Sequence, residues 1–477
     1  MSRYQDLKEI PSVPKLFGTA GIRGNVRNKV TEKLALDLAR AMSTMLSNDG
    51  QVVAGSDYRT TSAELKATLL GGLLGGGIDI VDAGILPTPV LAFSVRAVGA
   101  NAGIMVTASH NPPQDNGVKC YSHEGREYVS EEEEILEQII AQRQFADVAW
   151  DRVGKQIVGP DFVDMYIQRI LDRVGSLRRK LRVVVDCANG TTYNLTPLIL
   201  SKLGCEVISL NAHPDGRFPG RPAEPSPENL VRARQCVRSL KADLGIAHDG
   251  DGDRLAVIDE KGRYVNNDTV LAFFARLLLR ENGPGRIITS VDTSSRIYMV
   301  ARSSGGTVER TRLGKTHALL DEENRKSVKL CCEPWKIIDP AWGFWGDAIY
   351  AACRLIQSLD QTKSPVSSLF HGVPESPQKR FFFRCPDELK NIVMTEVSQA
   401  LTTQKDVSEV WTFDGVRVNF SDESWILVRK SGTEGKIRIY CEGRTPRRLK
   451  QLVSKSSGIV TAAIKRAQKP SMRPAQK

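Results

Sequence analysis

Short apolar runs alternate with longer amphipathic segments along most of this chain, and this alternation restricts the fold more than any other feature. Apolar runs at 52–57 and 102–109 have the length of buried strands, whereas residues 32–46 place apolar side chains at helical spacing. The same rhythm restarts at 181–190 and again at 285–292. Strands that alternate with helices predict α/β domains, here about three in succession.

The C-terminal region departs from this rhythm. Residues 424–443 are typical of two antiparallel strands around a polar loop, and residues 445–467 of an amphipathic helix. Residues 468–477 contain proline, lysine and glutamine, a composition typical of disorder. Because 477 residues are too many for one core, we expect three or four domains.

The net charge of +11 suits either nucleic acid or a small anionic substrate. The sequence shows no basic patch interleaved with aromatic residues, which favours the small anion and predicts no nucleic-acid partner. Nine cysteines without a CxxC pair predict reduced thiols in a cytoplasmic protein. The absence of an apolar leader and of a run of about 18 apolar residues predicts neither export nor a membrane partner.

The motif Thr107-Ala-Ser-His-Asn-Pro112 follows an apolar run and leads to Asn116-Gly-Val-Lys119. Ser109 therefore stands at the end of a predicted strand, where α/β sheets place ligand sites. A hydroxyl group there can act as a nucleophile or carry a phosphoryl group. The alternative is a polar turn that caps the next helix, and spacing alone leaves both open.

The segment Asp249-Gly-Asp-Gly-Asp-Arg254 lies between two predicted strands. Three carboxylates at alternate positions can converge on one hard cation, and unpaired carboxylates so close together repel each other. An EF-hand is a rival, with Glu260 at its twelfth position. However, Arg254 stands where that loop needs glycine, so a different metal site is predicted.

Two further loops suit phosphate. Arg429-Lys-Ser-Gly-Thr-Glu-Gly435 combines arginine, hydroxyl groups and backbone N–H groups exposed by glycine. Phe17-Gly-Thr-Ala-Gly-Ile-Arg-Gly24 offers glycines for close backbone approach, and Arg23 can meet a phosphate. Taken singly, the first can be a plain hairpin loop and the second a plain turn.

Together and in this order, the four segments resemble the α-D-phosphohexomutases, a family of phosphoglucomutases, phosphomannomutases and phosphoglucosamine mutases. The resemblance implies an α/β protein with three related α/β domains of mixed sheets, plus a C-terminal α+β domain, around a central cleft. The expected bounds are 1–155 with the phosphoserine loop, 156–260 with the metal loop, 261–372 with the sugar-recognition loop, 376–467 with the phosphate-binding loop, and a disordered tail at 468–477.

The resemblance also implies roles for single residues. Ser109 carries the phosphoryl group, and Asp249, Asp251 and Asp253, with a phosphate oxygen on Ser109, hold Mg²⁺. The other implied catalytic residues are His110 and Lys119, for proton transfer or for orienting the reacting hydroxyl, and Arg23, for the reacting phosphate. The implied substrate-binding residues are Arg254, Lys315, Glu333, Arg429, Ser431, Gly432 and Thr433.

One segment departs from the family pattern. Most members have Gly-Glu-x-Ser or Gly-Glu-x-Thr in a loop that reads sugar hydroxyls, and this chain has Cys332-Glu-Pro-Trp-Lys336. Glu333 survives, but Trp335 replaces the hydroxyl residue, as in loops of archaeal members. Asp347 matches the family's Asp at a helix start, and 312–315 matches another loop that reads substrate. The departure leaves the identity of the sugar open.

The predicted function is reversible transfer of phosphate between C1 and C6 of a hexose or amino-hexose phosphate, through phospho-Ser109 and a 1,6-bisphosphate. Phosphoglucosamine mutase and phosphomannomutase are the favoured activities. The alternatives are a phosphopentomutase of the same family and a catalytically degenerate regulatory protein that binds sugar phosphate. A homo-oligomer is compatible with the family and is not decided by the sequence.

Overall fold

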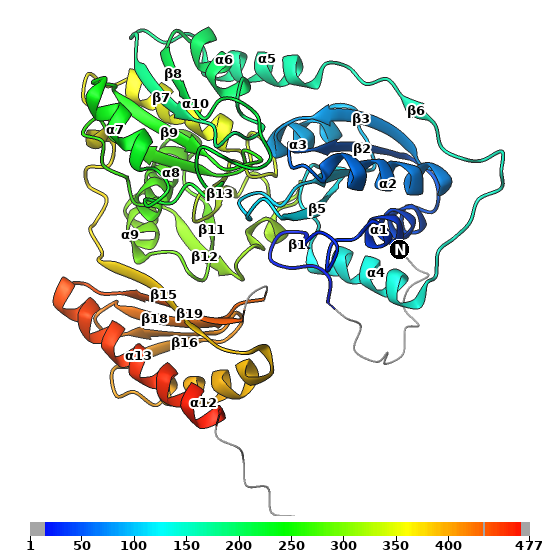
Figure 1. Ribbon diagram of the computed structural model, residues 1–477. Coiled ribbons are helices and arrows are strands. Elements are labelled where there is room, and N and C mark those ends of the chain that lie inside the picture. Colours follow the sequence, from blue (N-terminus) through cyan, green and yellow to red (C-terminus); the bar gives the residue numbers. More distant parts are fainter. Residues whose placement is uncertain (1–14, 433–434, 469–477) are drawn as a thin grey trace, which may run out of the picture. The chain divides into compact units, whose positions relative to one another are not determined.

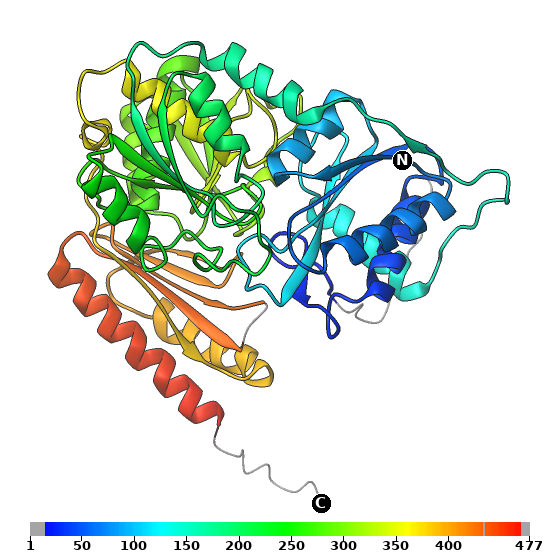
Figure 2. The same cartoon turned by 45° about the horizontal axis from the view of Figure 1, so that its top comes forward.

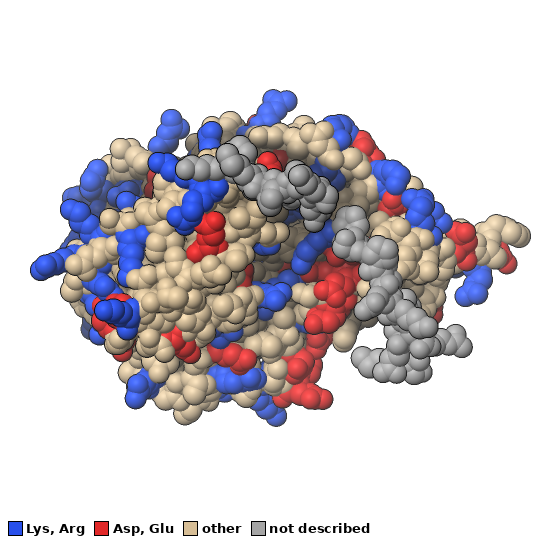
Figure 3. All heavy atoms as spheres, turned by 90° about the horizontal axis from the view of Figure 1, so that it is seen from below, with Lys and Arg blue, Asp and Glu red and all other residues tan. Residues whose placement is uncertain are grey.

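The computed structural model describes residues 15–432 and 435–468. Figure 1 shows sheets and helices alternating over most of the chain, followed by an antiparallel sheet near the C-terminus. No helix in these two ranges has the length and apolar character needed to cross a membrane. On the face in Figure 3, lysine and arginine side chains are scattered among neutral and acidic ones.

The first sheet is mixed and has the order β1-β5-β4-β2-β3-β6. β2, β3, β4 and β6 run parallel, and β1 and β5 run antiparallel to their neighbours. Its strands are β1 (Ile22–Asn25), β2 (Gln51–Ser56), β3 (Asp79–Ile85), β4 (Ala102–Val106), β5 (Asp115–Ser122) and β6 (Gln156–Ile157). Its helices are α1 (Glu32–Met45), α2 (Ser62–Gly75), α3 (Thr88–Ala97) and α4 (Ser130–Gln142).

Helices cover both faces of this sheet because side chains on a strand point alternately to its two sides. Val52 and Ala54 of β2 belong to the core shared with α1, α2 and α4. Gly55, the residue after Ala54, instead faces Leu91 of α3. The carboxyl end of β4 is left at the sheet edge, where Ser109 follows.

The second sheet has the order β10-β9-β7-β8, with only β10 antiparallel. Its strands are β7 (Arg182–Asp186), β8 (Glu206–Leu210), β9 (Leu244–His248) and β10 (Leu255–Ile258). Nearby helices are α5 (Phe162–Val174), α6 (Leu195–Lys202) and α7 (Val231–Ser239). The acidic segment 249–253 forms the connection from β9 to β10.

The third α/β region pairs β11 in parallel with both β12 and β13. Its elements are α8 (Asn267–Asn282), β11 (Arg286–Ser290), α9 (Ser295–Ser303), β12 (Thr307–Thr311), a 3₁₀ helix (Thr316–Leu319), β13 (Val328–Glu333), β14 (Lys336–Ile338), α10 (Ala348–Asp360) and α11 (Val366–Leu369). The predicted α/β pattern with mixed sheets is confirmed across the three regions.

The C-terminal sheet is antiparallel throughout, with the order β15-β19-β18-β17-β16. Its elements are β15 (Gln378–Arg384), a 3₁₀ helix (Asp387–Leu389), α12 (Lys390–Thr402), β16 (Val407–Trp411), β17 (Val416–Phe420), β18 (Trp425–Lys430), β19 (Lys436–Glu442) and α13 (Pro446–Ala467). Both helices lie on one face of the sheet (Figures 1 and 2) and share its core. The predicted pair of strands and the final helix are confirmed.

The chain forms two compact units. One comprises Met1–Val270, His317–Lys326 and Trp335–His371, and the other comprises Leu271–Thr316, Ser327–Pro334 and Gly372–Lys477. We call them the first and second unit. The domain bounds expected from the sequence remain a prediction, and residues 469–477 of the expected tail lie outside the described residues.

Candidate active site

Ser109 lies in a short loop three residues beyond β4. Its backbone has φ of 53°, a left-handed conformation that is unusual for serine. The Ser109 N–H donates to Thr107 Oγ1 (2.9 Å), and the Thr107 hydroxyl donates to Asp57 Oδ2 (2.8 Å). The alternative of a turn that caps a helix is wrong, because β5 follows the loop. The local bonds instead hold the serine at a fixed angle.

The buried side chain of Arg59 holds the same loop in place through hydrogen bonds. Its guanidinium donates to the carbonyl oxygens of Ser109 (3.0 Å) and Asn111 (2.6 Å), and to those of Pro112 (2.7 Å) and Asp115 (2.8 Å). The side chain is completely buried, and its Nε lies 3.2 Å from Asp57 Oδ2. Arg59 was not predicted as a site residue, although it follows a predicted strand end, where α/β sheets place functional groups.

Asp249, Asp251 and Asp253 are completely buried in the connection between β9 and β10. One carboxylate oxygen of each lies within 4.8 Å of the others. Within the described chain, Asp251 Oδ1 and Asp253 Oδ1 have no hydrogen-bond partner. Buried carboxylate oxygens without a donor are costly, so these residues fit a bound cation that takes oxygen ligands.

The structure brings Ser109 to this cluster. Its hydroxyl donates to Asp249 Oδ2 at 2.6 Å, although 140 positions separate the two residues. His110 Nδ1 lies 3.2 Å from Ser109 Oγ, and His110 Nε2 lies 3.4 Å from Arg254 Nη2. Because arginine only donates, Nε2 accepts and the proton of the neutral ring is assigned to Nδ1. His110 thus points an N–H group at Ser109 Oγ.

Lys119 reaches the other two aspartates from the neighbouring strand β5. Its Nζ lies 2.8 Å from Asp251 Oδ2 and 2.7 Å from Asp253 Oδ2, with only 1% of the side chain exposed. Arg23 of β1 pairs with Gly117 of β5. A Cβ at Gly117 would approach Arg23 Cγ to 3.0 Å, so Arg23 passes close to the strand that carries Lys119.

The surrounding charges shift the pKa values of Asp249 and Asp253 in opposite directions. Burial, together with Asp251 and Asp253, raises the pKa of Asp249 well above its usual value. Burial alone would also raise the pKa of Asp253, but the ammonium groups of Lys119 and Lys336 hold it well below its usual value. Burial, Arg254 and Arg23 lower the pKa of His110, which keeps its ring neutral. A divalent cation would relieve the repulsion that raises the pKa of Asp249.

Two contacts to the aspartates were not predicted. Thr88, at the start of α3, donates its hydroxyl to Asp251 Oδ2 at 2.7 Å. Lys336 Nζ lies 3.1 Å from Asp253 Oδ2 and 3.0 Å from Glu127 Oε1. Thr88 follows β3 closely, and the apolar run at 77–84 that forms this strand is a usable signal. No pattern around Lys336 indicated its contact.

In the second unit, one carboxylate joins two of the predicted substrate loops. Asp414 Oδ1 accepts a hydrogen bond from Arg429 Nη2 (2.8 Å), and Asp414 Oδ2 accepts one from Leu313 N (2.9 Å). Arg429 is buried, and its Nε has no partner within the described chain. A buried guanidinium with an unused N–H group suits an anion.

Glu333 holds the loop that contains Lys315. Its carboxylate accepts from Gly314 N (2.9 Å) and from the Thr316 hydroxyl (3.1 Å). Ser431 N donates to Lys436 O (2.9 Å) in the turn between β18 and β19. Gly432 has nothing within 4 Å of a Cβ built on it, and Thr433 lies outside the described residues.

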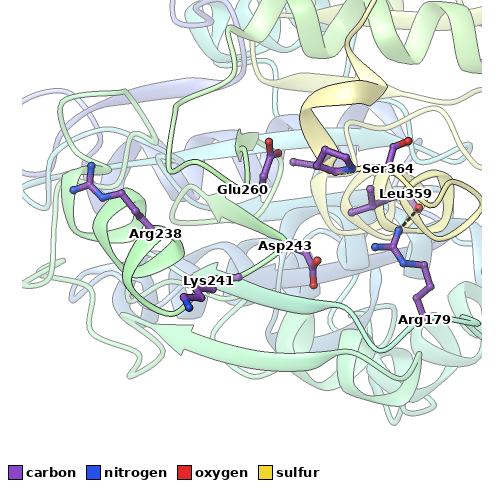
Figure 4. A pocket seen from close by; sticks show the side chains of 10 residues that line it. Arg179, Arg238, Lys241, Asp243, Glu260, Leu359 and Ser364 are labelled. Atoms are coloured by element: carbon purple, nitrogen blue, oxygen red, sulfur yellow. Dashed lines mark hydrogen bonds between the residues drawn. The ribbon is translucent and has the colours of Figure 1, made fainter.

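A separate pocket of about 230 Å³ lies in the first unit and shares no lining residue with the serine site. Figure 4 shows basic and acidic side chains around it. Arg179 donates to the carbonyl oxygens of Leu359 and Thr362, and Glu260 accepts from Ser367. Because Arg179 and Glu260 already have hydrogen-bond partners within the protein, we assign no ligand to this pocket.

The fold and the serine site define a phosphotransfer enzyme of the phosphohexomutase class. The chain matches all four domains of one family, described as phosphoglucomutase/phosphomannomutase: α/β/α domain I over residues 14–147, domain II over 161–262, domain III over 266–376 and the C-terminal domain over 383–456. The protein belongs to this family and is therefore a phosphomutase, an enzyme of the isomerase class.

Its relatives bear two different substrate names. It is 41% identical to a phosphopentomutase of Thermococcus kodakarensis, over 95% of this chain and 100% of that protein. It is 40% identical to a "Probable phosphoglucosamine mutase" of Methanothermobacter thermautotrophicus, over 94% of this chain and 99% of that one. The relatives therefore agree on the type of reaction and differ on the sugar.

Solved structures of the same class share the fold. A phosphoglucomutase/phosphomannomutase family protein from Burkholderia thailandensis has a TM-score of 0.81 and 27% identity, covering 94% of this chain and 97% of that one. The open form of a phosphoglucomutase, parafusin, from Paramecium has a TM-score of 0.74 at 19% identity, covering 95% and 96%. The second comparison concerns the fold alone.

Proposed function

We propose that this phosphomutase moves a phosphoryl group between the C1 and C6 oxygens of a hexose or amino-hexose phosphate through phosphorylated Ser109. The observation that carries the proposal is the 2.6 Å contact of Ser109 Oγ with Asp249, beside two buried carboxylate oxygens that have no donor among the described residues. A phosphoryl group on this hydroxyl needs positive charge nearby, and the cluster offers a place for it.

The proposed cofactor is Mg²⁺, held by Asp249, Asp251, Asp253 and an oxygen of the phosphoserine. When bound, it would offset negative charge on the phosphoryl oxygens. Three carboxylates from the protein leave coordination positions for phosphate oxygen and water, which suits Mg²⁺.

In the proposed reaction, a sugar hydroxyl oxygen forms a bond to the phosphorus of phospho-Ser109, and the bond from phosphorus to Ser109 Oγ breaks. The product is a bisphosphate. Its other phosphate then returns to Ser109 by the reverse step, so the enzyme ends phosphorylated. His110 is assigned to orienting Ser109 Oγ, because its N–H group points at that atom. The proton of the sugar hydroxyl passes to Ser109 Oγ as that oxygen leaves, and Lys119 is assigned to orienting the reacting hydroxyl.

The remaining predicted residues receive binding roles. Arg23 and Arg254 are assigned to the reacting phosphate, since Arg254 already reaches His110 and Asp249. The proposed site for the second phosphate has Arg429 at its centre, with its unused Nε as donor. The residues assigned with Arg429 to the substrate are Lys315, Glu333, Ser431, Gly432 and Thr433.

We expect Ser109→Ala to abolish mutase turnover and to remove a phosphate of about 80 Da from the intact mass. Ser43→Ala is the matched control, because Ser43 is a fully buried serine whose hydroxyl bonds within α1. The assay uses the 1- and 6-phosphates of glucose, mannose and glucosamine. Undiminished turnover by the Ser109→Ala protein contradicts a phosphoserine intermediate.

A phosphopentomutase is the second candidate, favoured by the relative in Thermococcus kodakarensis and by Trp335 in place of the family's hydroxyl residue. The same assay therefore includes ribose 5-phosphate. A kcat/KM for the pentose phosphate at least tenfold above every hexose phosphate would select this candidate.

A further inference from the structure

Trp335 and Lys336 form a short segment that leads into β14. Trp335 has φ of 69°, a left-handed backbone that is a genuine outlier for so bulky a residue. Its indole packs against the core of the second sheet, and its Nε1 donates to the Tyr264 hydroxyl at 3.0 Å. Trp335 therefore anchors the segment. Its side chain does not take over the role of the Ser or Thr hydroxyl that most family members have at this position.

The same segment is hydrogen-bonded to the chain just after the aspartate loop 249–253. The Trp335 carbonyl accepts a hydrogen bond from Leu255 N at 2.9 Å, two positions after Asp253. The Arg254 guanidinium lies 5.5 Å from the centre of the indole ring. Trp335 is thus held by its indole and by its carbonyl group. The next residue, Lys336, extends toward Asp253 and Glu127, and only 13% of its side chain is exposed.

The contacts around the aspartates set a charge balance. Four carboxylates with side chains at most 13% exposed take part: Asp249, Asp251, Asp253 and Glu127. Glu224 also lies 3.4 Å from Arg254, but its side chain is 41% exposed and water screens its charge, so it is left out of the balance. Three cations face them, namely Lys119, Lys336 and Arg254. Burial would raise the pKa of Glu127, but Lys336 and Lys119 lower it to about 2, so this carboxylate is ionised. With all four carboxylates ionised, as cation binding requires, the network carries one net negative charge before the charge of any metal is added.

We infer that Lys336 is a positioning residue of the reaction. Its ammonium group limits the affinity of the aspartate cluster for a metal ion, and the filled site therefore keeps net positive charge for the phosphoryl group. With Lys336 present, a divalent cation brings the network to one positive charge, which opposes the dianionic phosphoserine. Without Lys336, the carboxylates hold the cation more tightly, and the filled site is neutral before the phosphoryl group enters. The inference rests on the proposed transfer at Ser109 and adds a residue to it.

The test measures metal binding and turnover separately. Mg²⁺ binding is measured by titration calorimetry on full-length protein with Ser109→Ala, with and without Lys336→Met, so that phosphoserine does not contribute. We expect Lys336→Met to tighten Mg²⁺ binding about tenfold or more, because a unit charge a few ångströms from a divalent ion interacts strongly with it. In protein that keeps Ser109, the same change lowers kcat about tenfold.

Lys66→Met is the matched control, because Lys66 is a partly buried lysine paired with Asp82 at 2.8 Å and touches none of the site residues. Lys336→Arg keeps the charge and is expected to keep Mg²⁺ affinity within about twofold. Unchanged or weaker Mg²⁺ binding in Lys336→Met overturns the inference, since a purely structural lysine would weaken binding when lost. If no sugar phosphate turns over in the wild type, the proposed function fails while the calorimetry still decides on Lys336.

Discussion

Arg59 and the serine loop show what single residues contribute to this site. A left-handed serine backbone is strained, and such a conformation persists only where its surroundings determine it. Arg59 supplies that constraint through four carbonyl oxygens of one loop and through Asp57. Lysine cannot reproduce this fork of donors, because its ammonium group is a single point.

We therefore expect Arg59→Lys to lower kcat by about 10- to 100-fold through misplacement of Ser109, with little change in KM. Steady-state kinetics on the preferred sugar phosphate checks this. Arg179→Lys is the control, since Arg179 also bonds two carbonyl oxygens, Leu359 O and Thr362 O, away from the serine. Equal losses of kcat in the two variants would show that Arg59 acts only through stability.

Helix α10 shows, at the scale of an element, how one buried side chain with several hydrogen bonds fixes the structure around it. Its N-cap, Asp347, is a buried carboxylate that accepts from Tyr350 N (2.9 Å) and from the Tyr166 hydroxyl of α5 (2.7 Å). The indole N–H groups of Trp342 and Trp345 also donate to it, at 2.7 Å and 3.2 Å. One side chain therefore begins α10 and joins it to α5, and the predicted helix start at Asp347 is confirmed.

Asp347→Ala should lower the free energy of unfolding by about 3–5 kcal/mol, because four donors lose a buried charged acceptor. Asp161→Ala is the matched comparison. Asp161 is the exposed N-cap of α5 with one bond, to Asp164 N, and its loss should cost about 1 kcal/mol. Urea unfolding followed by circular dichroism measures both, and equal effects would contradict the network described for Asp347.

At the scale of the whole molecule, the aspartate cluster and Arg429 belong to different compact units. Units with separate cores need not unfold together, so one melting temperature does not describe such a chain. A ligand that binds only the folded form of one unit stabilises that unit by mass action.

Calorimetric unfolding should therefore show two transitions, only one of which responds to Mg²⁺. At about 100 times the dissociation constant, Mg²⁺ should stabilise that transition by about 2.7 kcal/mol. Asp251→Asn, which removes one ligand charge, should abolish the shift without moving the other transition. A shift of both transitions, or a shift that survives Asp251→Asn, contradicts the assignment of the cluster to one unit.

The sequence predicted the elements well because their signals are local. The strand predicted just before Asp249 matches β9, and the final helix matches α13 within one residue. The predicted strand at 102–109 is longer than β4, because the loop bonds of Thr107 and Ser109 end it at Val106. Asp249, Asp251 and Asp253 were recognised for a similar reason, since three carboxylates two residues apart are visible in the chain itself.

Contacts between segments that are far apart in the chain could not be predicted from such local patterns. Arg59, Lys336 and Asp414 carry no local motif, and each matters only because another segment lies beside it. What the sequence by itself determined about this protein is the α/β rhythm, the family and the chemistry of the serine and aspartate motifs, because each is written in neighbouring residues. Only the tertiary structure decided which cations face the aspartates, because charge balance in a buried site depends on distances through space and not along the chain.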